Sequence, residues 1–171
     1  MTHQEGSHDP LDLRKALGSF STGVVLITTR GPDGERVGLT VNSFASVSLR
    51  PPLVLWSLLV HSPNMAAFQA ASHFAVNVLG RSHKALARQF GRSNAQKFSG
   101  DDLWLEGAGG APLLATAVAQ FECRNAQRYY GGDHVIFLGE VEAYRHGPGE
   151  PLLFNGGRFG DFVPHLDDQT P

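Results

Sequence analysis

Cysteine is nearly absent from this chain, because Cys123 is the only one among 171 residues. One cysteine cannot form a disulfide within the chain, which fits a reducing compartment. Cys123 lies in a run of alternating apolar residues, so we expect a thiol packed in the core rather than a nucleophile.

Long hydrophobic runs and clusters of one charge are missing too. The longest apolar run, residues 53–60, is too short to cross a bilayer as a helix, and the N-terminus lacks the basic and apolar parts of a secretory signal. Charged residues make up 18% of the chain, the formal net charge is −2, and Lys and Arg are scattered. We therefore expect a cytoplasmic protein that binds neither a membrane nor a nucleic acid.

Several motifs of known chemistry are also absent. No G-x-G-x-x-G follows a strand and opens a helix, which argues against a Rossmann dinucleotide fold. The P-loop, the H-E-x-x-H zinc motif, C-x-x-C and the hydrolase elbow G-x-S-x-G do not occur either. No pair of histidines between the tails has the spacing of metal ligands, so we expect no metal site.

The residues that are present favour strands. We expect a helix opening at Asp9-Pro10, another around residues 65–70, and a third capped by Ser82. The strands that β-branched runs and turn residues predict span 24–29, 37–49, 53–60, 74–79, 118–129, 134–144 and 151–159. Because strands follow one another with helices only at corners, we predict a mainly β, antiparallel barrel with flanking helices. It forms one domain over residues 9–163, with flexible tails at 1–8 and 164–171.

The most informative stretch is T-V-N-S-F-A-S-V-S-L at 40–49, which carries no charge. If the stretch is one strand, its side chains point alternately to two faces, and those at odd positions face the core. Its even positions, among them Thr40, Asn42 and Ser46, would then line a face of neutral hydrogen-bonding groups suited to a flat polar ligand. The same pattern also fits an ordinary half-buried strand with a wet face.

Segments spread along the chain resemble, in order, the flavin reductase-like family, whose short-chain members supply two-component flavin monooxygenases. The segments that carry the resemblance are L-G-S-F-S-T-G-V-V-L-I-T-T at 17–29, V-G-L-T-V-N-S-F-A-S-V-S-L-R-P-P-L-V at 37–54, H-F-A-V-N-V-L at 73–79, A-R-Q-F at 87–90, G-G-D-H-V-I-F-L-G-E-V at 131–141 and P-L-L-F-N-G-G-R-F-G at 151–160.

The resemblance implies an FMN-binding split β-barrel. It implies a homodimer with the flavin site near the subunit interface, which binds FMN or FAD. NADH or NADPH then gives a hydride to the flavin, and the reduced flavin diffuses to a flavin-dependent oxygenase. Two alternatives stay open: a module of the same fold that keeps its flavin and does not turn over NAD(P)H, and a lipocalin-like carrier of apolar ligands.

The resemblance also implies roles for single residues. The residues expected to bind the flavin are Thr40, Asn42, Ser43, Ser46, Ser57, Ser62, Asn64, Gln89, Phe90, Phe154 and Arg158. The cation that balances the phosphate is left open among Arg88, Arg92 and Lys97. Asp133 and His134 form the G-D-H motif associated with nicotinamide, and His134 is the expected catalytic residue. The competing interpretations are a plain turn with an exposed histidine at 132–134 and core packing for Phe154.

Overall fold

The computed structural model describes residues 9–93 and 97–165. Its helices are α1 (Pro10–Leu17), α2 (Met65–Ala70) and α3 (Lys84–Phe90), with 3₁₀ turns at Arg81–His83, Asp101–Leu103 and Ala108–Gly110. Its strands are β1 (Thr22–Gly23), β2 (Val25–Arg30), β3 (Arg36–Val41), β4 (Ala45–Leu49), β5 (Pro52–Leu59), β6 (His73–Val78), β7 (Trp104–Glu106), β8 (Pro112–Leu114), β9 (Ala119–Gly131), β10 (His134–His146), β11 (Leu152–Asn155) and β12 (Arg158–Asp161). The tail predicted at 1–8 and residues 166–171 of the other tail lie outside the described residues.

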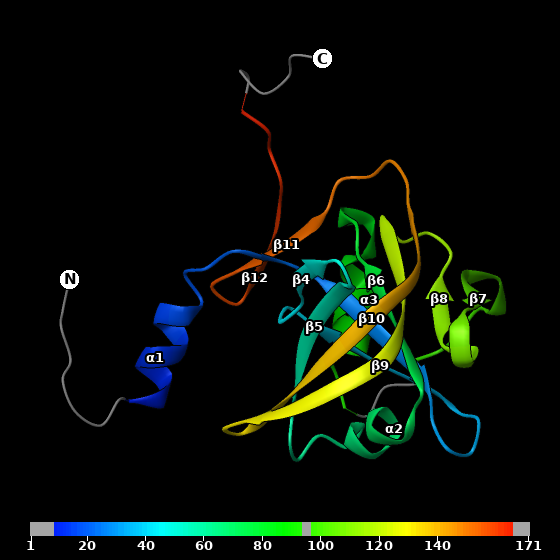
Figure 1. Cartoon of the computed structure of the whole chain (residues 1–171). Helices are drawn as coiled ribbons and strands as arrows, with labels where there is room; N and C mark the ends of the chain where they lie inside the picture. Colours follow the sequence, from blue (N-terminus) through cyan, green and yellow to red (C-terminus); the bar gives the residue numbers. More distant parts are fainter. Residues whose placement is uncertain (1–8, 94–96, 166–171) are drawn as a thin grey trace.

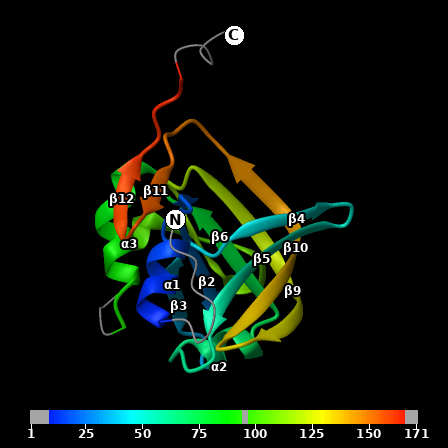
Figure 2. The same cartoon turned by 90° about the vertical axis from the view of Figure 1, so that its left-hand side faces the viewer.

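One large antiparallel sheet dominates the molecule (Figures 1 and 2). Within the described residues its strands follow the order β3-β2-β6-β9-β10-β5-β4, so its two end strands do not pair with each other. The sheet therefore does not close into a complete barrel, and the buried apolar residues form more than one cluster. The prediction of a mainly β, antiparallel fold is confirmed, and a second small sheet, β1-β11-β12, lies beside it.

Aromatic rings fill the main core. Trp56 stacks on Phe137 with ring centroids 4.7 Å apart, and Phe68 and Phe74 meet it edge-on. Burial of such large rings contributes much of the hydrophobic stabilisation of a domain this size. Cys123 is fully buried in the same cluster, as predicted, and burial there raises the pKa of its thiol to about 12, so the thiol stays protonated.

Three predicted elements are wrong in detail. The single strand at 37–49 is two strands, and Val47 and Leu49 on the supposed core face are 48% and 90% exposed. The chain leaves the sheet at residues 42–44, which shifts the alternation, so that the even-numbered Phe44 packs on the core instead. Ser82 lies inside the 3₁₀ turn that precedes α3 and does not cap the helix.

The last predicted strand is also two strands. Residues 151–159 were expected to run straight, but β11 and β12 form a hairpin whose turn is Gly156-Gly157. Both glycines have positive φ, 52° and 81°, which only glycine adopts readily. The predicted long hairpin of β9 and β10 is confirmed. Among the described helices, none is long and apolar enough to cross a membrane.

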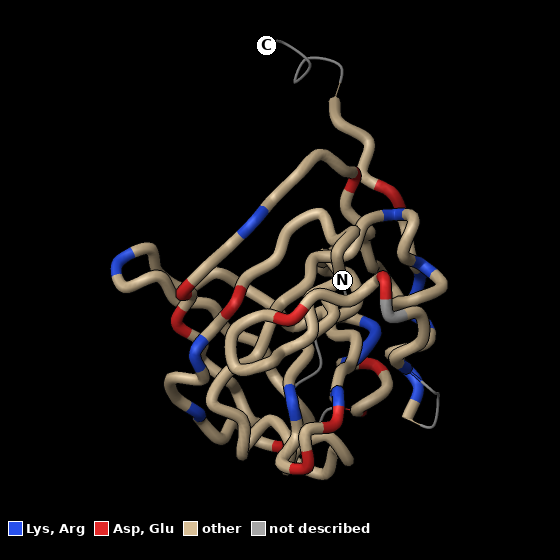
Figure 3. Tube along the Cα trace, turned by 90° about the vertical axis from the view of Figure 1, so that its right-hand side faces the viewer, with Lys and Arg blue, Asp and Glu red and all other residues tan. Residues whose placement is uncertain are grey.

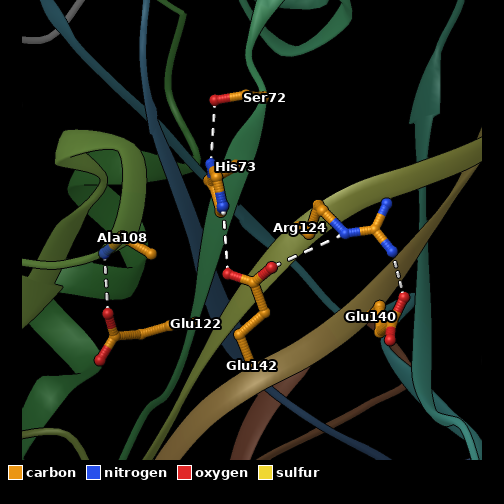
Figure 4. Close-up of polar contacts among 7 residues, drawn as sticks. All are labelled: Ser72, His73, Ala108, Glu122, Arg124, Glu140 and Glu142. Carbon is orange, nitrogen blue, oxygen red and sulfur yellow. Dashed lines mark hydrogen bonds and ion pairs between the residues drawn. The ribbon is translucent and has the colours of Figure 1, made fainter.

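Lys and Arg are interspersed with Asp and Glu along the described chain (Figure 3). Several of them join on the strands β6, β9 and β10, where His73 Nε2 lies 3.1 Å from Glu142 and Arg124 contacts both Glu140 and Glu142 (Figure 4). These contacts tie neighbouring strands together. None of these residues lines the cleft described below.

Candidate active site

The site begins where the chain leaves the sheet between β3 and β4. The hydroxyl of Ser43 accepts a hydrogen bond from the backbone N–H of Ser57 at 3.0 Å and donates to the carbonyl of Ser57 at 3.1 Å. One side chain thus occupies both backbone groups that a paired strand would have used. Ser43 therefore holds the β3–β4 connection on β5 while leaving a hollow beside it.

That hollow is a cleft of about 460 Å³, within the usual size range of small-molecule sites. Its walls come from the end of β3, the end of β5, the loop after β5 and the C-terminal end of α3. The predicted site residues that line it are Thr40, Asn42, Ser43, Ser57, Ser62, Asn64, Phe90 and His134. Residues from four separate segments of the sequence therefore meet in one place.

A second cavity of about 410 Å³ adjoins the cleft. The two share Thr40, Val41 and Asn42 from β3 and its end, together with Gly91 and Arg92 after α3. Of the predicted residues, Phe154 faces this second cavity rather than the first. The core-packing interpretation of Phe154 is also correct, because its ring packs against the buried cluster around Val24.

The walls of both cavities fit a neutral polar ring system with an anionic tail. Thr40 lines both cavities, and its buried hydroxyl oxygen has no hydrogen-bond partner among the described residues. A buried polar atom without a partner is costly, so a bound ligand that offers a partner here is stabilised. In the described part of the chain, no carboxylate lines either cavity.

The cations that the sequence left open all lie at these cavities. Arg92 lines both, Lys97 lines the first and Arg88 lines the second. Lys97 donates from Nζ to the carbonyl of Gly38 at 3.0 Å, and burial lowers the pKa of its ammonium group. Arg92, which both cavities share, is the best placed to meet a phosphate group lying between them.

His134 lines the first cleft but not the second cavity. Its Nδ1 lies 2.7 Å from Oδ1 of Asp133, and the backbone N–H of Val60 donates to the carbonyl of Asp133 at 2.9 Å. The hydrogen bond to His134 lowers the pKa of the Asp133 carboxyl, so the carboxylate stays charged. Asp133 thus orients the imidazole and anchors the hairpin tip on β5, and its own side chain does not line the cleft.

Other predicted residues also lie outside both cavities. Ser46 is exposed on β4, Arg158 is exposed at the start of β12, and Gln89 donates to the carbonyl of Lys97 at 3.2 Å. The lining residues that the sequence did not indicate include His61 in the first cleft and Phe159 in the second. The turn N-G-G-R at 155–158 would have revealed Phe159, because a hairpin there pairs it with Phe154.

Comparison with known proteins decides the family. The family model described as "Flavin reductase like domain" matches residues 17–162. The chain belongs to this family. It is 46% identical over 158 residues to the FMN reductase (NADH) SmoA of Agrobacterium fabrum, covering 92% of this chain and 88% of that protein.

Two further members are similar. A Streptomyces globisporus NADH:FAD oxidoreductase, solved in complex with NAD and FAD fragments, superposes with a TM-score of 0.85 at 43% identity, over 95% of this chain and all of that one (100%). The reductase subunit HsaB of a flavin-dependent monooxygenase from Rhodococcus jostii is 38% identical over 164 residues, 95% of this chain and 83% of that protein.

Proposed function

We propose that the protein is an NAD(P)H:flavin oxidoreductase that reduces FMN or FAD by hydride transfer and releases the reduced flavin to a flavin-dependent monooxygenase. The observation that carries the proposal is the cleft itself, which combines neutral hydrogen-bonding walls with the cations Arg92 and Lys97 and with His134. Family members named as an FMN reductase, an NADH:FAD oxidoreductase and a monooxygenase reductase subunit support it.

The chemistry of hydride transfer belongs to the two cofactors, since a reduced nicotinamide gives its hydride to an oxidised flavin when the rings stack. The chain must hold the rings in contact and keep water out. Thr40 and Asn42 offer donors and acceptors to the polar edge of a flavin, and Arg92 with Lys97 offers charge to its phosphate. His134, which Asp133 orients through Nδ1, would contact the nicotinamide through Nε2 or a face of its ring.

The proposal is tested by mixing purified protein, NADH or NADPH, and free FMN or FAD, while following the absorbance of the reduced nicotinamide. Consumption that depends on added flavin is the expected result. If neither nicotinamide is consumed and flavin stays with the protein through desalting, the alternative of a flavin-retaining electron-transfer module replaces the proposal.

A homodimer and a cytoplasmic location complete the proposal. α1 has no buried residue and stands away from the sheet in Figure 1, and Leu17 and Phe20 at its end are 68% and 78% exposed. The β4–β5 hairpin projects from the body of the molecule in Figure 2, and its Leu49 is exposed. A second copy that covers these residues would place the flavin cleft near the interface, because Asn42 and Ser43 also line the groove beside α1. The lone buried thiol of Cys123 supports the location.

A further inference from the structure

The second cavity is lined by a pair of aromatic rings. Phe154 and Phe159 are cross-strand partners in the β11–β12 hairpin, with ring centroids 5.5 Å apart and planes at 63°. Both rings are half-buried, so part of each faces the cavity. Val24 and Ala87, which are 2% and 1% exposed, form an apolar floor beneath them.

A guanidinium group completes the surface. The Arg88 Cζ atom lies 5.8 Å from the centroid of the Phe159 ring, and both residues line the cavity. Aromatic rings and arginine planes over an apolar floor are the groups on which proteins stack nucleic-acid bases. The cavity is therefore suited to a planar heteroaromatic ring.

The connection between the two cavities shows how such a ring would be attached. Arg92 and the Thr40–Asn42 segment border both, and His134 borders the first alone. A flavin with its phosphate at Arg92 would place any group attached to that phosphate at the mouth of the second cavity. In FAD the attached group is an adenosine monophosphate, and in FMN nothing is attached.

We propose that the cavity formed by Phe154, Phe159 and Arg88 is an adenine subsite, and that the chain thereby binds FAD more tightly than FMN. The inference rests on the proposed function and deepens it. Adenine also occurs in NADH, but His134, the expected nicotinamide contact, lines the first cleft and not the second cavity. The experiment separates the two sources of adenine.

The test compares Phe159→Leu with wild type by quenching of flavin fluorescence, with no nicotinamide present. Leucine keeps an apolar side chain and removes the stacking face. We expect the dissociation constant for FAD to rise about tenfold and that for FMN to change less than about twofold. Adenosine monophosphate should weaken FAD binding to the wild-type protein, leave FMN binding unchanged, and lose its effect in the variant.

The matched control is Phe121→Leu, since Phe121 is a half-buried ring stacked on Phe44 at 6.0 Å that lines neither cavity. Arg88→Gln serves as a second variant on an exposed position that folding does not depend on, and it should also weaken FAD selectively. If binding of FAD and of FMN were weakened equally, the proposal would be overturned, because Phe159 would then stabilise the whole cleft rather than contact adenine.

A different result would assign the adenine to the other cofactor. If Phe159→Leu raises the KM for NADH with FMN as acceptor, while both flavins bind as in wild type, the subsite belongs to NADH and the proposal for FAD is wrong. Failure of the wild-type protein to bind any flavin would instead contradict the proposed function.

Discussion

The side chain of Ser43 hydrogen-bonds both backbone groups of Ser57, and this pair marks where the sheet opens to form the cleft. The hydroxyl substitutes for a strand partner at the last position where β4 would have paired with β5. Because β4 itself pairs with β5 only over residues 52–55, the hydrogen bonds of Ser43 hold this side of the cleft wall at Ser57.

Replacing Ser43 by alanine should loosen that wall. Ser43→Ala leaves the N–H and carbonyl of Ser57 without their partner, which should cost about 1–3 kcal/mol of the free energy of unfolding. Urea denaturation measures the loss, and flavin affinity should fall with it. Ser48→Ala is the control, because the Ser48 hydroxyl only accepts from the Arg50 N–H in an exposed turn. Equal effects of the two variants would contradict a special role for Ser43.

How far the sequence predicts this site is clear from residues 37–49. The alternation of apolar residues correctly predicts that the apolar side chains of β3 pack on the core. The run of uncharged polar residues correctly indicates that Thr40 and Asn42 line a cleft. Alternation cannot predict the break at 42–44, because the break depends on a hydrogen bond to Ser57 from a different strand. Long-range contacts of this kind have no signature in a local pattern.

Two further differences involve residues close together in the sequence. Asp133 belongs to a motif that the resemblance assigns to cofactor binding, yet the structure shows its side chain on His134 rather than on the cleft. The predicted single strand over 151–159 does not place Phe159 at the site, because the double-glycine turn folds it back onto Phe154. The helices and the long hairpin were predictable, since their caps and turns lie within a few residues of one another.

Thr40 provides a test in which stability and binding change in opposite directions. Thr40→Val removes a buried hydroxyl that has no partner among the described residues, so the free protein should be unchanged or more stable by about 1 kcal/mol. Flavin affinity should fall about tenfold, because the ligand loses a hydrogen bond. Both are measured on one preparation, by urea denaturation and by flavin fluorescence.

Thr22→Val is the matched control for this prediction. The Thr22 hydroxyl is likewise buried without a partner in the described part of the chain, but Thr22 lines neither flavin cavity. Its replacement should therefore change stability in the same direction and leave flavin affinity as in wild type. A loss of affinity in both variants would show that Thr40 has no direct contact with the flavin.

His134 should affect the nicotinamide rather than the flavin. His134→Ala is expected to raise the KM for NADH about tenfold, the effect of one lost hydrogen bond or ring contact, while the dissociation constant for flavin stays the same. Steady-state kinetics at saturating flavin measure the change. His146→Ala, an exposed histidine at the other end of β10, is the control. Unchanged NADH kinetics in His134→Ala would mean that the exposed-turn interpretation is right.

Acidification should weaken the fold through His83. Its Nδ1 accepts a hydrogen bond from the Gly80 N–H at 3.0 Å, and Nε2 lies 3.0 Å from the Thr116 hydroxyl. Burial lowers the pKa of His83 below its ordinary value of 6.5, so the unfolded chain binds the proton more readily than the folded one. The stability contributed by the neutral ring is complete above pH 6.5 and declines as the pH falls toward the folded-state pKa.

Urea midpoints at about pH 7.5 and about pH 5 should therefore differ more for the wild type than for His83→Asn. The asparagine side chain accepts from the Gly80 N–H but does not titrate. If both proteins lose the same stability between these pH values, other groups are responsible and His83 is not the sensor.

The proposed homodimer predicts that charge on exposed apolar residues near α1 and β4 separates the subunits. Leu17→Lys with Leu49→Lys replaces side chains that are 68% and 90% exposed in the single chain. Burying each at an interface would contribute about 1.5–3 kcal/mol, so the dimer dissociation constant should rise at least about tenfold. Sedimentation velocity measures it. Leu105→Lys on β7, 43% exposed and across the molecule from α1 in Figure 1, should leave the dimer intact. If the double variant sediments as the wild type does, the interface lies elsewhere. Flavin affinity measured on the separated subunits would show whether the cleft depends on the partner subunit.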